Sequence, residues 1–242
     1  MRMLVSDLDG TLLGNDDALS RFTEWYTTHG DQFRLVYASG RFFDSIVELI
    51  HSTQLPEPEA VIASVGTRIC LYPGGEHIDA WPQCLGHWDV KGICDILTVS
   101  SKLVLQPDEV QTEFKLSFHA DGLNTSDLVK MRRRLSEHGY SAEMVYSSNH
   151  DLDVLPAGIH KGSAAAFLAS EWGLKPKQVV VCGDTGNDLP MFMHGFRGVV
   201  VGNAQSELKA LQSPDVYHSE QEYADGVLDG INYWLRRQTV TA

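Results

Sequence analysis

Asp7-Leu8-Asp9-Gly10-Thr11 follows an apolar run at residues 3–5 that predicts a short buried strand. A second apolar run, residues 179–182, leads into Gly183-Asp184-Thr185-Gly186-Asn187-Asp188. Side chains alternate along an extended segment, so Asp7 and Asp9 are expected on one side, and Gly10 lets the chain turn behind them. Two strand ends that both carry carboxylates predict one site for metal-assisted phosphoryl transfer.

A simpler interpretation of these motifs is structural, because Asp7 and Asp9 could form a turn while Asp184 and Asp188 cap a helix. Two close carboxylates repel each other unless a cation lies between them. Mg²⁺ takes oxygen ligands and usually keeps waters and phosphate oxygens in its shell. Because both motifs follow apolar strands, the metal site is favoured over the structural interpretation.

The two motifs resemble those of the haloacid dehalogenase-like phosphohydrolases, which combine Asp-X-Asp-X-Thr after the first strand with a later Gly-Asp-X-X-X-Asp. The resemblance implies that Asp7 is the nucleophile and that Asp9 is the general acid and base. It also implies that Asp184 and Asp7 bind Mg²⁺ through their side chains, that Asp9 binds it through its backbone carbonyl, and that Asp188 supports the site.

Positive and hydrogen-bonding groups for the phosphate are expected between the acidic motifs. Ser39-Gly40-Arg41 follows the predicted strand 34–38 and precedes a helical pattern, where a hydroxyl and free N–H groups suit a phosphate oxygen. The family places a phosphate-binding Ser or Thr at the position of Ser39. Lys161 opens another helical stretch, where its charge is unfavourable unless an anion is near, and it matches the third family motif. Thr11 and Asn187, inside the acidic motifs, are predicted to bind phosphate or substrate too.

The resemblance extends over nearly the whole chain and is closest to the sucrose-phosphate phosphatase family. Segments outside the shared motifs carry it, namely residues 65–67, 114–119, 146–148, 151–156 and 203–208. The chain departs from the usual family pattern at Ser39, Thr185 and His160. These departures leave the chemistry intact, and relatives that act on mannosylfructose phosphate share the same skeleton.

The composition is that of a globular enzyme. The chain has 242 residues, a hydrophobic content of 43% and a formal charge of −13. This charge disfavours nucleic acids and anionic membranes, and the basic run at residues 132–134 is interpreted as a solvated helix face. The four cysteines form no Cys-X-X-Cys pair, and the ten histidines show no metal-binding spacing, although His119 and His160 lie near motifs. A cytoplasmic location is expected, because no signal peptide or long apolar run is seen.

The order of predicted elements indicates an α/β fold with a Rossmann-like, doubly wound parallel sheet. Strands are predicted near residues 3–6, 34–38, 60–64, 179–182 and 198–201. Helices are predicted near residues 17–29, 43–52, 162–173, 187–194, 205–211 and 224–237. Residues 1–81 and 158–242 are therefore predicted to form a catalytic core, and residues 82–157 a small α+β cap inserted between the second and third motifs. The cap is predicted to contain helices at 88–99 and 125–138 and strands at 103–105, 114–119, 142–147 and 151–155.

A cap closes a carboxylate site against water and supplies specificity. Lys115 is the cap residue predicted to contact the sugar or the phosphate, with an exposed edge-strand lysine as the alternative. The predicted function is a Mg²⁺-dependent sugar-phosphate phosphatase acting on sucrose 6-phosphate. Another sugar phosphate such as mannosylfructose phosphate, a phosphomutase, and a catalytically silent sugar-phosphate sensor are the alternatives. A monomer is expected, and association with the cognate sugar-phosphate synthase is left open.

Overall fold

The larger part of the molecule is built on a seven-stranded sheet. The computed structural model describes residues 1–81 and 87–239. The strand order is β11-β10-β9-β1-β2-β3-β4, parallel throughout except for the antiparallel β3–β4 pair. The strands are β1 (Arg2–Ser6), β2 (Phe33–Ala38), β3 (Ala60–Ala63), β4 (Arg68–Leu71), β9 (Val179–Gly183), β10 (Arg197–Val200) and β11 (Val216–His218). The predicted doubly wound parallel sheet is confirmed, with an antiparallel edge strand added.

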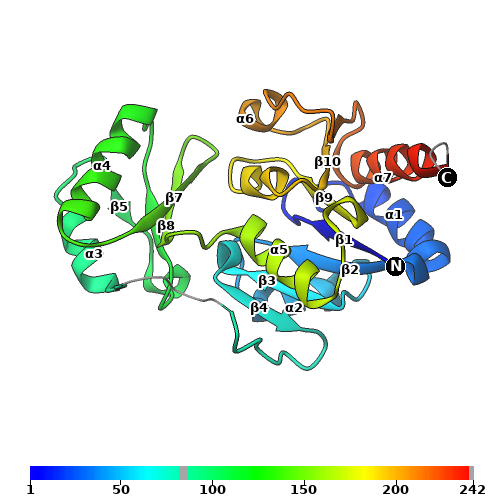
Figure 1. Ribbon diagram of the computed structural model, residues 1–242, viewed down its shortest axis with the longest axis horizontal. Coiled ribbons are helices and arrows are strands. Elements are labelled where there is room, and N and C mark those ends of the chain that lie inside the picture. Colours follow the sequence, from blue (N-terminus) through cyan, green and yellow to red (C-terminus); the bar gives the residue numbers. More distant parts are fainter. Residues whose placement is uncertain (82–86, 240–242) are drawn as a thin grey trace.

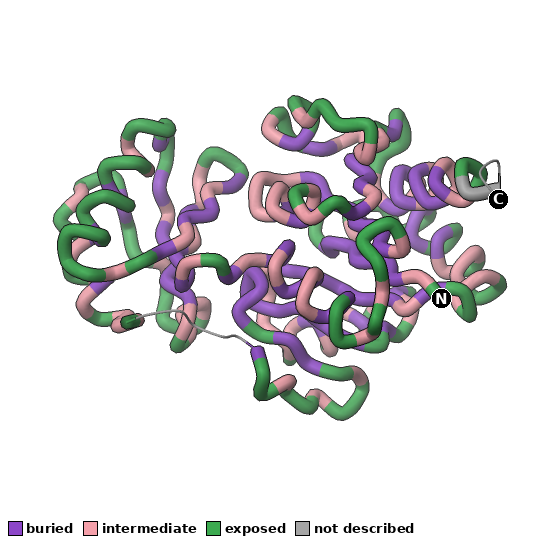
Figure 2. The backbone as a smooth tube through the Cα atoms, viewed as in Figure 1, coloured by how far each residue is buried: buried purple, intermediate pink, exposed green. Residues whose placement is uncertain are grey.

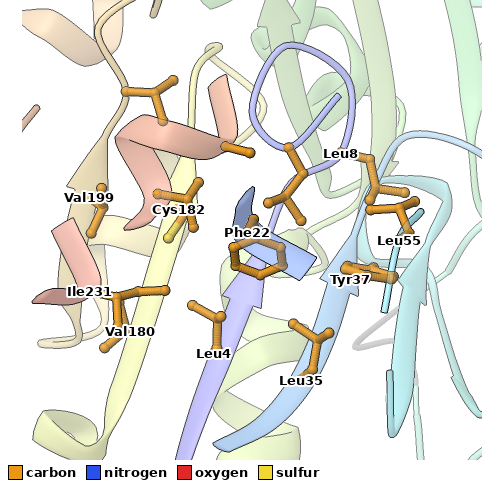
Figure 3. Packing of buried hydrophobic residues seen from close by; sticks show 14 of the residues in the cluster. Leu4, Leu8, Phe22, Leu35, Tyr37, Leu55, Val180, Cys182, Val199 and Ile231 are labelled. Carbon is orange, nitrogen blue, oxygen red and sulfur yellow. The ribbon is translucent and has the colours of Figure 1, made fainter. Parts of the chain in front are cut away.

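Helices cover both faces of this sheet (Figure 1). Along β1, Leu4 points into one apolar cluster while Met3 and Val5 point into the other, as the two-residue period of a strand requires. Helices α1, α2 and α7 cover the Leu4 face, and Figure 3 shows Phe22 of α1 packed between Leu4 and Tyr37. Helix α5 covers the other face. The helices are α1 (Asp16–His29), α2 (Phe43–Ser52), α5 (Lys161–Glu171), α6 (Ser206–Lys209) and α7 (Tyr223–Thr239), with 3₁₀ turns η1 (Gly30–Gln32), η2 (Ser64–Gly66), η4 (Pro176–Gln178) and η5 (Leu189–Met193).

A second, four-stranded sheet lies beside the first, away from both chain ends (Figure 1). Its strand order is β5-β6-β8-β7, and every neighbouring pair is antiparallel. Two helices pack on one face of it around Phe118, Leu135 and Leu152. Its elements are α3 (Val90–Leu97), β5 (Val104–Leu105), η3 (Asp108–Val110), β6 (Leu116–His119), α4 (Thr125–Glu137), β7 (Ala142–Ser147) and β8 (Asp151–Pro156). We propose this unit as the cap; its predicted first boundary, residue 82, lies outside the described residues.

Several predicted elements differ from the structure. The helix predicted at 187–194 is instead a turn followed by η5, in which Pro190 at the start removes a backbone donor. The helix predicted at 205–211 is only the four-residue α6. Strand β11 was not predicted, because Val216-Tyr217-His218 is short and largely half-buried. Lys115 precedes β6, an interior strand of its sheet, and is buried; the exposed edge-strand alternative for it is wrong.

Buried residues run along the strands of both sheets (Figure 2), and some of them join the two units. Val65 of η2 forms a small apolar cluster with Val145 of β7 and Leu155 of β8. A Cβ on Gly186 would stand 2.7 Å from the carbonyl oxygen of Tyr146, so the loop after β9 approaches β7 more closely than any larger residue allows. This contact brings the second acidic motif next to the smaller sheet.

Candidate active site

Both acidic motifs lie at the point in the sheet where the order of the strands reverses, between β1 and β9. β1 pairs with β2 on one side and with β9 on the other, so the loops that follow β1 and β9 are neighbours. The backbone N–H of Asp7 donates to the carbonyl of Cys182 at 3.1 Å, which fixes the first loop against the end of β9. Ligands of doubly wound sheets bind at such switch points. Because β1 ends at Ser6, strand alternation does not govern where Asp7 and Asp9 point.

Lys161 is the centre of the buried polar cluster. Its ammonium group lies 2.7 Å from Asp7 Oδ1, 2.6 Å from Asp188 Oδ1 and 3.0 Å from Asn187 Oδ1. A lysine has three N–H donors, so each of them has an acceptor here. The side chain of Lys161 is fully buried at the first residue of α5. The structure thus brings together four residues that the sequence predicted from three separate motifs.

The charges in this cluster do not balance. Burial raises the pKa of Asp7 well above its usual range, against the attraction of Lys161. Burial and the neighbouring Asp188 raise the pKa of Asp184 to about 7. Burial alone would lower the pKa of Lys161, but the attraction of Asp188 and Asp7 outweighs it and raises that pKa. Asp7 pairs with Lys161, yet its pKa is raised. Both observations hold because three carboxylates share one lysine, so the cluster lacks positive charge.

A divalent cation fits this deficit. Asp7, Asp184 and Asp188 are buried and offer carboxylate oxygens within 4.8 Å of one another. Both oxygens of Asp188 are already used, since Oδ1 faces Lys161 and Oδ2 accepts from the backbone N–H groups of Asp184 and Thr185. Asp7 and Asp184 are therefore the better side-chain ligands, and Asp188 holds Lys161 and the loop in place. An all-oxygen donor set suits Mg²⁺.

Thr11 and Gly10 shape the position of Asp184. The Thr11 hydroxyl donates to Asp184 Oδ1 at 2.9 Å and is buried, so the structure gives Thr11 a positioning contact, while its predicted binding of phosphate stays a prediction. Gly10 has a φ of +84°, and a Cβ there would stand 2.4 Å from Asp184 Oδ2. Glycine is required at this position by both the backbone conformation and the space for the carboxylate.

Asn203 is a positioning residue for which the sequence predicted no role. Its side-chain amide donates to the carbonyl of Gly10 at 2.7 Å, and its oxygen accepts from the N–H of Tyr223 at 2.8 Å. Asn203 thereby ties the first acidic loop to the start of α7. The family-like segment at residues 203–208 was the signal that could have found it.

Asp9 and Arg41 form the outer part of the site. Arg41 donates to both carboxylate oxygens of Asp9, each at 2.7 Å, and both side chains are partly exposed. Such a bidentate pair fixes the orientation of the carboxylate. Ser39 is buried at the end of β2, and its Oγ accepts from the N–H of Arg41 at 3.1 Å. Ser39, Gly40 and Arg41 therefore form one turn beside Asp9.

A strained loop supports that turn. Ser64 and Val65 have φ values of 51° and 60°, a conformation that is uncommon for any residue but glycine and rarest for a β-branched one such as Val65. The N–H of Ser64 donates to the carbonyl of Arg41 and the N–H of Val65 to that of Ser39. A Cβ on the next residue, Gly66, would lie 2.2 Å from the backbone of His160. The predicted similarity at residues 65–67 thus marks a loop that links the phosphate-site turn to the start of α5.

A polar cleft of about 370 Å³ runs from this turn to the second sheet. Lys115 lies in it with its Nζ 3.8 Å from Asp153 and 5.6 Å from the centre of the Phe42 ring. Ser117 donates to Asp153 at 2.6 Å. The cleft is lined by Gly40, Arg41, Phe42, Ser45, Gln106, Val110, Lys115, Ser117, Ser147, Asp151, Asp153 and Asn187. Neutral and charged hydrogen-bonding groups on its cap side suit a ligand rich in hydroxyls.

His160 caps the helix that carries Lys161. Its Nδ1 accepts from the N–H of Ser163 at 3.0 Å, and its ring lies 5.8 Å from that of His194. Burial, with a smaller contribution from His194, lowers the pKa of His160 from 6.5 to about 4.

Because the pKa of His160 is lower in the folded protein, the unfolded chain binds a proton there more readily between about pH 6.5 and 4. The folded state therefore loses stability relative to the unfolded state as the pH falls through that window. His160→Asn keeps a hydrogen-bond acceptor at the cap but does not titrate. Between pH 7 and 5 we expect its free energy of unfolding to fall by about 1 kcal/mol less than that of the wild type, after allowance for solvent screening. Urea unfolding at the two pH values measures the difference. An equal loss in both proteins would show that His160 titrates normally.

Fold and site together point to the haloacid dehalogenase-like phosphoric monoester hydrolases. A buried Asp-Lys-Asp cluster lies at the switch point of a doubly wound sheet, and an α+β unit is inserted beside it. The family model of sucrose-6F-phosphate phosphohydrolases matches residues 1–235. The chain belongs to this family and is a sugar-phosphate phosphatase.

Individual relatives agree with this placement. The mannosylfructose-phosphate phosphatase of Agrobacterium fabrum is 36% identical over 240 residues, which cover 97% of each chain. Sucrose-phosphatase 2 of Nicotiana tabacum is 33% identical over 96% of this chain, which spans only 58% of that protein. The Synechocystis sucrose-phosphatase, whose crystal structure contains sucrose and phosphate, has a sequence identity of 31% to this chain. The two structures superpose with a TM-score of 0.89 over 97% of this chain and 98% of that one.

Proposed function

We propose that this phosphatase hydrolyses sucrose 6-phosphate to sucrose and phosphate. The observation that carries the proposal is the polar cleft beside Arg41, large enough for a sugar and lined on its cap side by Lys115, Gln106 and Asp151. The family model and the structure of the Synechocystis enzyme with sucrose and phosphate support the same substrate. The identity of 36% to a mannosylfructose-phosphate phosphatase keeps mannosylfructose phosphate as the second candidate. The relatives named above are phosphatases, which supports hydrolysis over a phosphomutase or a silent sensor.

In the proposed mechanism Asp7 attacks the phosphorus atom and forms an aspartyl-phosphate. Lys161, 2.7 Å from Asp7, offsets negative charge as the two anions approach. Asp9, protonated and released from Arg41, gives its proton to the departing sugar oxygen. The resulting carboxylate then takes a proton from the water that attacks the aspartyl-phosphate, which releases phosphate and regenerates Asp7. Arg41 holds the Asp9 carboxylate at the edge of the cleft. Mg²⁺, held by Asp7, Asp184 and the backbone of Asp9, would neutralise charge on the phosphate.

The turn at the end of β2 is proposed to bind the phosphate group. Ser39 offers a hydroxyl and Gly40 a backbone N–H group there, and Arg41 offers a guanidinium that suits phosphate oxygens. Asn187, which accepts from Lys161 and lines the cleft, is proposed to contact the substrate as well.

Removal of the metal is expected to abolish activity reversibly. Without a cation, Asp7, Asp184 and Asp188 face one lysine, so added Mg²⁺ should raise both the rate and the melting temperature of chelator-treated enzyme. Phosphate release and thermal unfolding, each measured before and after Mg²⁺ is restored, test this. Full activity in enzyme shown to be metal-free by elemental analysis would contradict it.

Substrate preference is tested by catalytic efficiency across sugar phosphates. We expect sucrose 6-phosphate to exceed mannosylfructose phosphate, glucose 6-phosphate and fructose 6-phosphate, because a site that hydrogen-bonds several hydroxyls rejects ligands that leave it unpaired. Lys115→Ala should lower the efficiency for sucrose 6-phosphate by about tenfold or more, as expected for losing a charged hydrogen bond, and affect a small aryl phosphate less.

Lys130→Ala, which changes an exposed lysine on α4, is the matched control and should leave the catalytic efficiency for both substrates unchanged. A preference for mannosylfructose phosphate would replace the proposed substrate and leave the phosphatase activity in place. Equal losses for the sugar and aryl phosphates in Lys115→Ala would contradict a specificity role for Lys115.

No helix within residues 1–81 and 87–239 is long and apolar enough to span a membrane. We propose a cytoplasmic monomer, and its association with the synthase that makes the sugar phosphate stays a proposal. The formal charge of −13 supports the absence of nucleic-acid partners.

A further inference from the structure

Two histidines and two aspartates meet at one end of the four-stranded sheet, outside the carboxylate cluster. One ligand atom from each of His119, His150 and Asp151 lies within 4.8 Å of the others. His150 Nδ1 also lies 2.5 Å from Asp121 Oδ1. No motif spacing indicated this group, because His119 and His150 are 31 positions apart and meet only through strand pairing.

The backbone holds these side chains on well-defined positions. His119, the last residue of β6, is directly paired with Asp151, the first residue of β8. The turn before β8 has Ser148 and Asn149 at positive φ, and the carbonyl of His150 accepts from the N–H of Ala120 at 2.7 Å. The group is therefore placed by a hydrogen-bonded strand pair and a tight turn, not by a long loop.

The side chains already face one another. The His119 and His150 rings stack with centroids 4.7 Å apart and an angle of 29° between their planes. His119 Nδ1 lies 3.4 Å from Asp151 Oδ1, and Gln106 Nε2 donates to the same oxygen at 3.0 Å. Each imidazole thus has a carboxylate beside Nδ1, and one carboxylate has an amide partner, the kind of outer contact that orients metal ligands.

We propose that His119, His150 and Asp151 form a binding site for a zinc-like divalent ion. Imidazole nitrogen and carboxylate oxygen are ligands that Zn²⁺ accepts, and three protein ligands leave a fourth position for water. Bonds of about 2 Å in a tetrahedral site would bring ligand atoms to about 3.3 Å from one another. The side chains are about half exposed, so small rotations can close the present spacing. Mg²⁺ is a poor match, because it prefers an all-oxygen shell.

Occupation of this site would act on the substrate cleft. Asp151 and Gln106 both line the cleft that contains Arg41 and Lys115. An ion that takes the Asp151 carboxylate would remove that group, and its Gln106 contact, from the sugar side of the cleft. Zinc is therefore expected to raise KM for the sugar phosphate and to leave kcat and small aryl phosphates largely unchanged. This consequence rests on the proposed function, whereas the binding itself does not.

Equilibrium dialysis with Zn²⁺ in a large excess of Mg²⁺ tests the binding. The wild type should bind one zinc that His119→Ala/His150→Ala loses, with an affinity drop of about 100-fold or more, since loss of even outer-shell partners costs about 10- to 100-fold. His138→Ala, which changes an exposed histidine at the C-cap of α4, should bind zinc as the wild type does. His150→Gln, which keeps a polar side chain for Asp121, should also weaken binding and guards against a folding defect in the double variant.

Cobalt provides a second readout, because Co²⁺ in a tetrahedral nitrogen and oxygen site absorbs visible light. The wild type should show this absorption, and the double variant should not. Equal zinc binding by wild type and double variant, or an equal loss in His138→Ala, would overturn the proposed site. If zinc binds as expected but leaves KM for sugar phosphates unchanged, the site stands and its coupling to the cleft is refuted.

Discussion

Asp7→Asn is expected to lower turnover by about 10⁴- to 10⁶-fold, the range seen when a covalent nucleophile is removed from an enzyme. The amide keeps the size of the carboxylate but loses the charge and most of the nucleophilicity. Phosphate release under single-turnover conditions measures the loss. Asp95→Asn, at an exposed position on α3, is the matched control and should retain full activity.

The fold of Asp7→Asn should be at least as stable as that of the wild type in Mg²⁺-free buffer. Burial raises the pKa of Asp7, and the nearby Asp188 and Asp184 raise it further, so removing the charge of Asp7 relieves the cluster. Melting temperatures measured with and without Mg²⁺ separate this effect from metal binding. Near-wild-type phosphate release by a verified Asp7→Asn protein would refute the nucleophile.

Lys161→Met is expected to remove activity and to destabilise the fold by about 3–5 kcal/mol, because it leaves buried carboxylates without their partner. Methionine fills similar space, so the loss reports charge and hydrogen bonds more than volume. Denaturant unfolding in Mg²⁺-free buffer measures the change in the free energy of unfolding. Lys130→Met on the surface of α4 should change it little.

A second variant distinguishes the charge effect from a packing defect. Lys161→Met/Asp188→Asn removes one of the carboxylates left without a partner, so it should recover part of the lost stability and none of the activity. If the double variant is no more stable than Lys161→Met, the buried ion pair does not account for the destabilisation.

The sequence predicts the carboxylates of the site well because each follows a strand whose end is easy to recognise. Asp7 and Asp184 are predicted from the pattern of apolar strand and turn, and Lys161 from its place at a helix start and its match to the third family motif; the structure brings the three together. The residues that support these groups are placed by the backbone conformation of their loops instead. The left-handed backbone at Ser64 and Val65 has no composition signal, since neither residue favours it.

The cap is less predictable for a related reason. Its strands are recognisable one by one, but the order β5-β6-β8-β7 decides which of them are interior. Lys115 is buried against Asp153 of β8 and the ring of Phe42, and His119 meets Asp151 because β6 pairs with β8. Neither relation can be obtained from the spacing of residues along the chain.

The central claim is that the phosphoryl group passes through Asp7, and an acid quench during steady-state turnover tests it most directly. Tandem mass spectrometry of the quenched enzyme should find a phosphoryl group on the peptide that contains residues 7–11, mapped to Asp7, and the group should disappear when substrate is exhausted. With a small aryl phosphate, whose leaving group needs little protonation, Asp9→Asn should accumulate more of this species, because Asp9 activates the water that cleaves it. A phosphoryl group on another residue would contradict the mechanism, as would no phosphoenzyme in either protein when the substrate is still turning over.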